Sequence, residues 1–353
     1  MVKNTIMILL FLGIIFAGIV GYRYLSPDEE LPFDDEQEGL SEQIVFTFSH
    51  VVAENTPKGR AADKFAELVN EKSNGKIKIV VFPNGSLFSD IEDITALKEG
   101  QVHFIATSTA KMGGLSPEWA VLDLPFAFPT YEAIEEGIHG PIGTHLLDSL
   151  QKKGILGLAH WSNGFKQITS NTGPIRLPQD LQGQTIRIMN SDTLRAQYEL
   201  LGAEAQPESF NDTYHLIEAG KIDGEENTIS NIYSKKFYEV QKHLTISNHG
   251  YLGYVVMMDQ KVWDQQSKNT QQILLEAMQE TTAWNDRQAI KINEEQLELI
   301  KQNSSIQIHE LSNQEKEQWK KKLDPLYDTL AATIGDKLVD ELKALRTTYE
   351  MKE

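Results

Sequence analysis

The chain has no cysteine among its 353 residues. This absence excludes a disulfide framework, a thiolate nucleophile and a zinc site built on thiolates. It also excludes a lipid-modified cysteine as a tether to a membrane.

Catalytic motifs are missing as well. The sequence contains no G-x-S-x-G elbow, no H-E-x-x-H pair and no glycine-rich phosphate loop. Its nine histidines include no pair four residues apart, the spacing that would indicate a metal site on a helix. We therefore expect neither an enzyme nor a bound metal or cofactor.

Basic charge is scarce. Lysine and arginine together number 33, against 51 aspartates and glutamates, so the formal net charge is −18. This balance argues against nucleic acid as a partner, because nucleic-acid binding needs a basic face. Any anionic ligand must instead be attracted by a local pocket rather than by the field of the whole molecule.

The N-terminus carries a targeting segment. Lys3 precedes an unbroken apolar run from Ile6 to Val20, whose length lies between that of a signal peptide and that of a membrane-spanning helix. Residues 1–25 are therefore either a cleaved signal peptide or an uncleaved N-terminal membrane anchor, with the anchor slightly favoured. Both alternatives place the rest of the chain outside the cytoplasm, anchored at the outer face of the cell membrane or secreted.

An acidic linker follows at residues 26–43. It holds eight aspartates and glutamates, and no lysine or arginine occurs between Arg23 and Lys58. Such a segment repels itself and stays solvated. Part of the negative charge of the chain therefore belongs to this linker and not to the folded part.

Globular sequence begins at Ile44 with strands that alternate with helices. The expected strands are 44–50, 76–82 and 102–109, and the expected helices are 59–75 and 90–100. This order is typical of parallel α/β units. Ligands in such folds lie beyond the carboxyl ends of strands, which here means residues 50–55, 83–87 and 108–112.

Residues 183–254 hold the most informative stretch. In GQTIRIMN, Ile186 and Ile188 point one way while Arg187 and Met189 point the other, which indicates a strand. A guanidinium at the end of a strand suits bidentate capture of a carboxylate. The alternative is a strand arginine that pairs with a surface acid.

The same stretch resembles the solute-binding proteins of tripartite ATP-independent periplasmic (TRAP) transporters, and within them the branch that binds C4-dicarboxylates. The resemblance rests on the pattern G-x-x-I-R … L-G-A … F … Y … G-x-x-D-G-x-E-N … K-x-Y-E-V-Q-K-x-L-T … H, and it extends from about Ile44 to about Leu345. It implies a two-lobe, periplasmic-binding-protein-like α/β fold with a cleft between the lobes and a long helix that spans both.

Three residues match the motif of the family position by position. The resemblance implies that Arg187 holds a ligand carboxylate, that Phe210 places its ring against the carbon chain, and that Asn227 donates its amide to a carboxylate oxygen. A guanidinium, a neutral donor and an apolar surface together suit a small carbon chain that bears carboxylates.

Other candidates are more loosely matched. Lys166 stands where many members have arginine, so it can neutralise a second carboxylate only as a point charge, without the bidentate fork. Trp161 forms either a wall of the site or part of the packing at the crossover between the lobes. The further candidates for ligand contact are His50, Asn55, Ser108 and His249, and for these a hydrogen-bonded structural role is the alternative.

The lobes are expected to be discontinuous. Lobe I is expected to comprise residues 44–164 and about 253–292, and lobe II residues 165–252 and about 293–345, before a frayed tail at 346–353. From Val262 to about Asn303 the apolar spacing predicts helix throughout, which matches the long helix of the family.

The resemblance implies a function in uptake. The protein is expected to be a monomer that binds succinate, fumarate or malate in the interlobe cleft and delivers it to the integral membrane subunits of a TRAP transporter. Two alternatives are a ligand-binding co-receptor for a membrane sensor kinase that responds to dicarboxylates, and the binding of another organic acid.

Overall fold

The structure is a computed structural model that describes residues 43–352. The predicted targeting segment and nearly all of the acidic linker lie outside the described residues. Within residues 43–352, no helix combines the length and the apolar character needed to cross a membrane.

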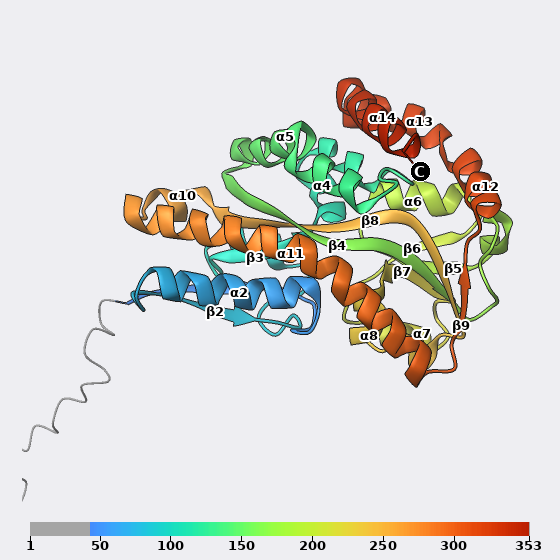
Figure 1. Ribbon diagram of the computed structural model, residues 1–353, viewed down its shortest axis with the longest axis horizontal. Helices are drawn as coiled ribbons and strands as arrows, with labels where there is room; N and C mark the ends of the chain where they lie inside the picture. The colour runs from blue at the N-terminus through green and yellow to red at the C-terminus, as the bar shows by residue number, and fades with distance from the viewer. Residues whose placement is uncertain (1–42, 353) are drawn as a thin grey trace, which may run out of the picture. The chain divides into compact units, whose positions relative to one another are not determined.

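One mixed sheet of nine strands forms the centre of the folded part (Figure 1). The strands are β1 (Ile44–Ser49), β2 (Ile77–Phe82), β3 (Phe104–Ser108), β4 (Ile155–Ser170), β5 (Thr185–Ile188), β6 (Glu204–Pro207), β7 (Gly224–Thr228), β8 (His243–Asp259) and β9 (Gln307–Glu310). Their order across the sheet is β2-β1-β3-β8-β4-β7-β5-β6, and β9 pairs with β8.

The sheet has two parallel halves, which we call the lobes. Lobe I contains β1, β2 and β3, which pair in parallel, and lobe II contains β5, β6 and β7, which also pair in parallel. The alternation of strands and helices between residues 44 and 109 predicted the parallel unit of lobe I. The antiparallel pair β4 and β8 runs through both lobes and joins them; these two long strands were not predicted.

The helices cover the two faces of this sheet. They are α2 (Pro57–Lys72), α3 (Asp93–Lys98), α4 (Tyr131–His139), α5 (Pro141–Ser149), α6 (Asp192–Leu200), α7 (Thr213–Glu218), α8 (Ile229–Ser234), α9 (Phe237–Val240), α10 (Gln260–Asp264), α11 (Lys268–Asn303), α12 (Asn313–Leu323), α13 (Pro325–Ile334) and α14 (Asp336–Glu350). Two short 3-10 helices, η3 (Thr109–Gly114) and η4 (Pro117–Asp123), belong to lobe I.

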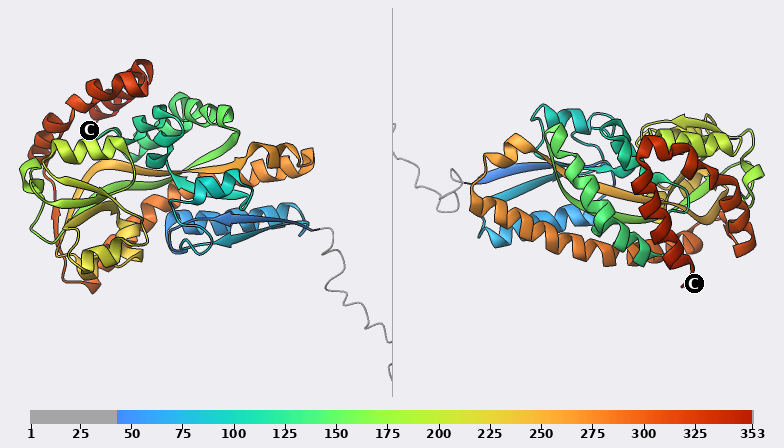
Figure 2. Two further views of the ribbon diagram at one scale, coloured as in Figure 1. Left: turned by 180° about the vertical axis from the view of Figure 1, so that it is seen from behind. Right: turned by 90° about the horizontal axis from the view of Figure 1, so that it is seen from above.

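The predicted long helix is α11, which packs against α2 of lobe I, against β4 and against α8 of lobe II (Figures 1 and 2). Its predicted start was wrong. The Ser267 side chain accepts a hydrogen bond from the backbone N–H of Thr270 and begins α11, while α10 ends at Asp264. A serine cap of this kind starts a new helix because it pairs a backbone donor that the helix itself leaves free.

The crossover between the lobes is irregular and is held by α11. Register shifts interrupt the pairing of β4 with β8, one of them between Ser162 and Gly164. Asn285 and Asn293 of α11 donate hydrogen bonds to the carbonyl oxygens of Ser162 (2.9 Å) and Asn163 (2.7 Å). The long helix therefore binds directly to the irregular part of β4.

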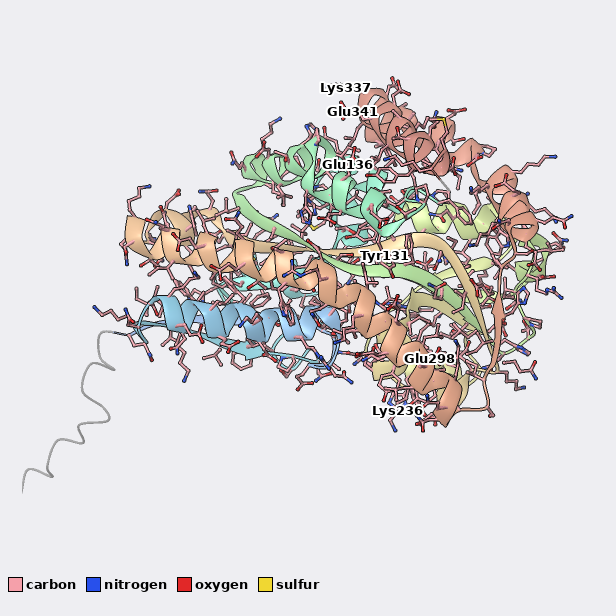
Figure 3. All side chains as sticks on the ribbon, in the orientation of Figure 1. Tyr131, Glu136, Lys236, Glu298, Lys337 and Glu341 are labelled. Atoms are coloured by element: carbon pink, nitrogen blue, oxygen red, sulfur yellow. The ribbon has the colours of Figure 1, made fainter. Side chains whose placement is uncertain are left out.

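The C-terminal helices differ from the prediction. Tyr327 of α13 and Leu342 of α14 join an apolar cluster with Trp119 of lobe I, although the sequence placed this region with lobe II. The Tyr349 hydroxyl of α14 donates to the Glu136 carboxylate at 2.7 Å. Glu136 lies on α4, which packs against α14 (Figure 3). The predicted fraying from residue 346 is also wrong up to residue 350, since Arg346 bonds Asp324 at 2.8 Å within a regular helix.

Candidate functional site

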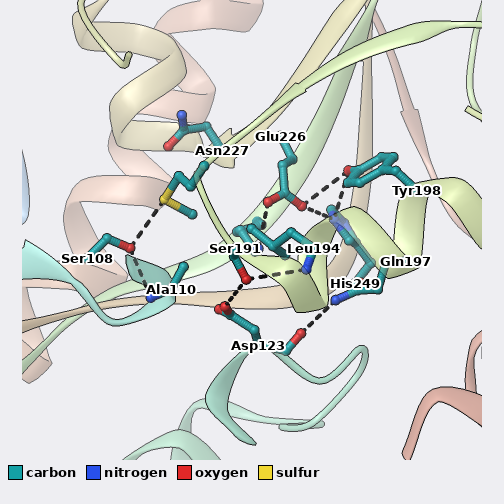
Figure 4. A network of polar contacts seen from close by, with 12 residues as sticks. Ser108, Ala110, Asp123, Ser191, Leu194, Gln197, Tyr198, Glu226, Asn227 and His249 are labelled. Carbon is teal, nitrogen blue, oxygen red and sulfur yellow. Dashed lines mark hydrogen bonds and ion pairs between the residues drawn. The ribbon is translucent and has the colours of Figure 1, made fainter. Parts of the chain in front are cut away.

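A small cavity of about 30 Å³ lies where the two lobes meet. Lobe I contributes residues from the end of β1, from α2 and from the segments around α3 and β3, and lobe II contributes residues from β5, β7 and α8. The lobes touch beside the cavity, where the Ser108 hydroxyl of lobe I lies 3.2 Å from the Met189 sulfur of lobe II (Figure 4). The cavity therefore lies between the two lobes.

Arg187 reaches the cavity from β5. Alternation along this strand places Ile186 and Ile188 in the apolar core and Arg187 and Met189 on the cavity side, as the sequence predicted. The Arg187 side chain is 1% exposed, and its Nε and Nη2 donate to the Glu208 carbonyl oxygen at 3.0 and 2.8 Å. Since no described carboxylate forms an ion pair with Arg187, its other N–H groups are free for a ligand.

Lys58 is a second buried cation on the same cavity, and it comes from the first turn of α2 in lobe I. Its Nζ donates to the Ala106 carbonyl oxygen at 2.9 Å and lies 3.6 Å from the centroid of the Tyr254 ring. Its side chain is 1% exposed, and no described carboxylate forms an ion pair with it. Burial lowers the pKa of Lys58 to about 7, although Asp93 and Asp90 oppose the shift.

Two acids of lobe I line the same wall as Lys58. Asp90 accepts hydrogen bonds from Lys111, and Asp93 accepts one from the Thr107 hydroxyl. Lys111 also donates to the Asp90 carbonyl oxygen. The charge of Lys111 is therefore paired with Asp90, whereas the charge of Lys58 has no ion-pair partner among the described residues and can interact with a ligand in the cavity.

Asn227 and Phe210 complete the lobe II side. The Asn227 amide nitrogen donates to the Glu225 carboxylate at 3.0 Å, and its oxygen accepts from Asn231 at 2.7 Å. Burial raises the pKa of Glu225 to about 7, against the Asn227 hydrogen bond and the Arg187 charge, which lower it. The Phe210 ring lies 5.9 Å from the Arg187 guanidinium carbon and adds an apolar surface.

The structure does not bring Lys166 or His249 to this cavity. Both bind Glu226, which alternates with Asn227 along β7 and so points to the opposite face of the sheet. Lys166 lies 2.7 Å and His249 2.9 Å from the Glu226 carboxylate, to which the Tyr198 hydroxyl also donates (Figure 4). Burial alone would raise the pKa of Glu226, but Lys166 and His249 lower it to about 2. Lys166 thus neutralises a buried glutamate.

The remaining candidates from the sequence lie in different places. Ser108 lines the cavity. Trp161 is fully buried in the core, where its ring stacks on Phe48 with the ring centroids 5.8 Å apart. Of the two roles considered for Trp161, the structure therefore shows packing and not a wall of the site. His50 is buried and Asn55 is exposed, and neither lines the cavity; burial lowers the pKa of His50 to about 3, and the Lys58 charge adds to that shift.

Sequence reasoning missed Lys58, Asp90 and Lys111. One signal for Lys58 was present: a cation in the first turn of a helix is unfavourable to the helix dipole, and it therefore points to another role. Lys111 lies within the stretch 108–112, which was expected to face the cleft, but nothing singled it out there. Asp90 falls after the turn that follows β2, where acidic residues are common.

A larger hollow of about 640 Å³ lies elsewhere, between α4, β4 and α11. It is open to solvent, and its one lysine or arginine is Arg287. We place the functional site at the smaller cavity because two buried cations without ion pairs meet there. Within the described residues, no group of three or more histidine, aspartate or glutamate side chains is arranged to hold a metal ion.

Comparison with known proteins gives the family. Residues 48–333 match the bacterial extracellular solute-binding proteins, family 7. The chain belongs to this family. A curated relative, the C4-dicarboxylate-binding protein DctB of Bacillus subtilis, is 59% identical over 338 residues, which cover 96% of this chain and 97% of the relative.

Solved structures of similar proteins confirm the two-lobe fold. A TRAP periplasmic solute-binding protein from Sulfurospirillum deleyianum, with bound succinate, is 40% identical with a TM-score of 0.83, and the match covers 86% of this chain and 99% of that one. A second, from Pseudomonas aeruginosa with bound L-malate, is 35% identical with a TM-score of 0.79, over 81% and 99% of the two chains.

Proposed function

We propose that this family 7 protein is the extracytoplasmic solute-binding component of a TRAP transporter and that it binds a C4-dicarboxylate such as succinate, fumarate or malate. One observation carries the proposal. Two buried cations that lack ion pairs, Arg187 of lobe II and Lys58 of lobe I, line one cavity between the lobes. The relatives that bind C4-dicarboxylates support it.

The chemistry of the two cations argues for two carboxylates. A buried charge is costly unless it is paired, and a ligand carboxylate provides the partner that the protein itself does not. Arg187 offers a bidentate fork for one carboxylate, and Lys58 offers a point charge for the other. Lys58 thus takes the role that the sequence assigned to Lys166, while Asn227 and Phe210 keep their predicted roles.

The position of the cations on different lobes links binding to closure. A dicarboxylate that contacts Arg187 and Lys58 together binds the closed arrangement better than an open one, and it therefore shifts the equilibrium toward closure. The closed, loaded protein then delivers its ligand to the integral membrane subunits of the transporter. In this role the site binds and releases its ligand without chemical change.

Thermal unfolding in the presence of a ligand panel tests the proposal. A ligand at a hundred times its Kd stabilises the folded state by about 2.7 kcal/mol, so succinate, fumarate or malate should raise the unfolding midpoint clearly, while acetate, sugars and amino acids with uncharged side chains should not. Arg187→Ala should abolish the shift, because removing one partner of a buried charge pair typically costs about 3–5 kcal/mol.

The matched control is Arg176→Ala. Arg176 is an arginine of lobe II whose side chain is 57% exposed and pairs with Glu315 at the surface, so this variant should keep the full shift. The proposal fails if no C4-dicarboxylate shifts the midpoint. It also fails if Arg187→Ala binds succinate within about threefold of the unchanged protein, a difference below about 1 kcal/mol.

A further inference from the structure

Asp90 differs from every other acid around the cavity in how its oxygens are paired. Its side chain is buried, with 7% exposed, and it lines the cavity from lobe I. One carboxylate oxygen, Oδ2, accepts from Lys111. The other, Oδ1, is buried and has no hydrogen-bond partner among the described residues.

The neighbouring Asp93 provides the contrast. Its Oδ1 accepts from the backbone N–H of Ile94 at 2.7 Å, and its Oδ2 accepts from the Thr107 hydroxyl. Two buried acids thus line one wall, and only Asp90 has an oxygen left over. Because buried polar atoms are nearly always paired in folded proteins, Oδ1 of Asp90 requires an explanation.

Asp90 stays ionised in this environment. Burial opposes its ionisation, but Lys111, Arg187 and the backbone N–H of Phe210 together lower its pKa. The Phe210 N–H helps to lower this pKa, but it forms no hydrogen bond to Oδ1. An ionised carboxylate only accepts hydrogen bonds, so it repels a dianionic ligand unless that ligand presents a donor to it.

We propose that Asp90 accepts a hydrogen bond from a hydroxyl group on the ligand, so that the site prefers 2-hydroxy C4-dicarboxylates, such as malate, over succinate and fumarate. This inference rests on the proposed function. Asp90 and Arg187 line the same cavity, and both inner carbons of a C4-dicarboxylate lie next to a carboxylate, so a hydroxyl on either of them is a 2-hydroxy group. Asn231, on lobe II, lines the same cavity with a second unpaired acceptor, its Oδ1.

Calorimetric titration of the purified full-length protein with succinate and with each enantiomer of malate tests the inference. A site whose buried acceptor is paired by a substrate hydroxyl discriminates strongly against the analogue that lacks it. At least one enantiomer of malate should therefore bind at least tenfold more tightly than succinate. Asp90→Asn should reduce this ratio to below threefold, because the amide removes the charge and half of the accepting capacity.

Asp93→Asn is the matched control, since it removes an equally buried charge from the same wall whose oxygens are already paired. It should keep the malate-to-succinate ratio even if both affinities change. The ratio also cancels any effect of Asp90→Asn on Lys111 or on folding. Equal binding of succinate and both malates by the unchanged protein, within threefold, would overturn the inference and leave the proposed function standing.

The inference is likewise wrong if Asp90→Asn retains the full ratio, or if Asp93→Asn loses it to the same degree. Failure of all three ligands to bind the unchanged protein would overturn the proposed function, and the hydroxyl preference with it.

Discussion

Lys58 occupies an unusual position for a lysine that is proposed to bind the ligand. It lies two residues after the Thr56 cap of α2, in the first turn of the helix, where the helix dipole disfavours a cation. It is also fully buried, and burial lowers its pKa to about 7. A lysine kept under these two disadvantages makes physical sense if an anion regularly approaches it.

Binding at this site should therefore depend on pH through Lys58. The free lysine loses its proton as pH rises through about 7, whereas a bound carboxylate stabilises the ammonium and raises its pKa. Each pKa unit of difference corresponds to a factor of ten in affinity. Titrations with succinate should show affinity about 20-fold weaker at pH 8.5 than at pH 6.5, with proton uptake on binding.

The variant Lys58→Arg separates the pH dependence due to Lys58 from the pH dependence due to Glu225, which also titrates nearby. Arginine keeps its proton throughout this range, so the variant should lose most of the pH dependence. Glu225, whose pKa burial raises to about 7, acts in the same direction and accounts for a residual slope. A pH dependence in Lys58→Arg as steep as in the unchanged protein would contradict the assignment of Lys58 to the ligand.

At the scale of elements, strand alternation explains what could be read from the sequence. In β5 the pattern of Ile186, Arg187 and Ile188 predicted correctly that Arg187 points away from the two isoleucines. The structure shows that the isoleucines face the core and that Arg187 faces the cavity. The same period of two separates Glu226 from Asn227 in β7. Lys166 could not be assigned in this way, because its side chain depends on which residue of β7 lies opposite, and that register is a tertiary feature.

The continuity of β4 and β8 is the main feature that sequence reasoning did not reach. Gly164 lies within β4 at a positive φ of 115°, so the local sequence resembles a turn, although pairing with β8 and contacts with α11 keep the strand continuous. The sequence prediction placed the crossover between the lobes at residues 164 and 165, but the geometry of the crossover depends on a partner strand almost ninety residues later.

Helix α11 should stabilise this crossover through Asn293. Its amide donates to the Asn163 carbonyl oxygen of β4 at 2.7 Å, and its oxygen accepts from the Ser230 backbone N–H of α8 at 2.9 Å. Asn293→Ala leaves two buried backbone groups without partners, each at a cost of about 1–3 kcal/mol. Urea unfolding should therefore show a loss of about 2–4 kcal/mol.

The control for this helix is Lys291→Ala, two residues away. Lys291 is 64% exposed and only approaches Glu295 at 3.7 Å, so its loss should change the free energy of unfolding by less than about 0.5 kcal/mol. If Asn293→Ala were no more destabilising than Lys291→Ala, α11 would pack against the crossover without stabilising it.

At the scale of the whole molecule, a ligand with two negative charges favours closure of the two lobes. The chain carries a net charge of −18, so a dianion gains nothing from the overall field and must be held by the few cations at the cleft. Arg187 and Lys58 reach the cavity from different lobes, so a ligand with two carboxylates can satisfy both only when the lobes meet. Binding of the dianion and closure of the lobes are therefore thermodynamically coupled.

The central claim is that two carboxylates bridge the two lobes, and an electron paramagnetic resonance distance measurement tests it most directly. Because the chain has no cysteine, spin labels can be placed at will. Ile91→Cys marks lobe I and Lys236→Cys marks lobe II, at side chains that are 72% and 61% exposed.

Succinate should shorten the distance between the labels. Succinamate, which replaces one carboxylate by an amide, should leave the open distance dominant at concentrations where succinate closes the lobes fully, because it cannot neutralise both cations. If succinamate closed the lobes as completely and at the same concentration as succinate, the bridge between Arg187 and Lys58 would be contradicted.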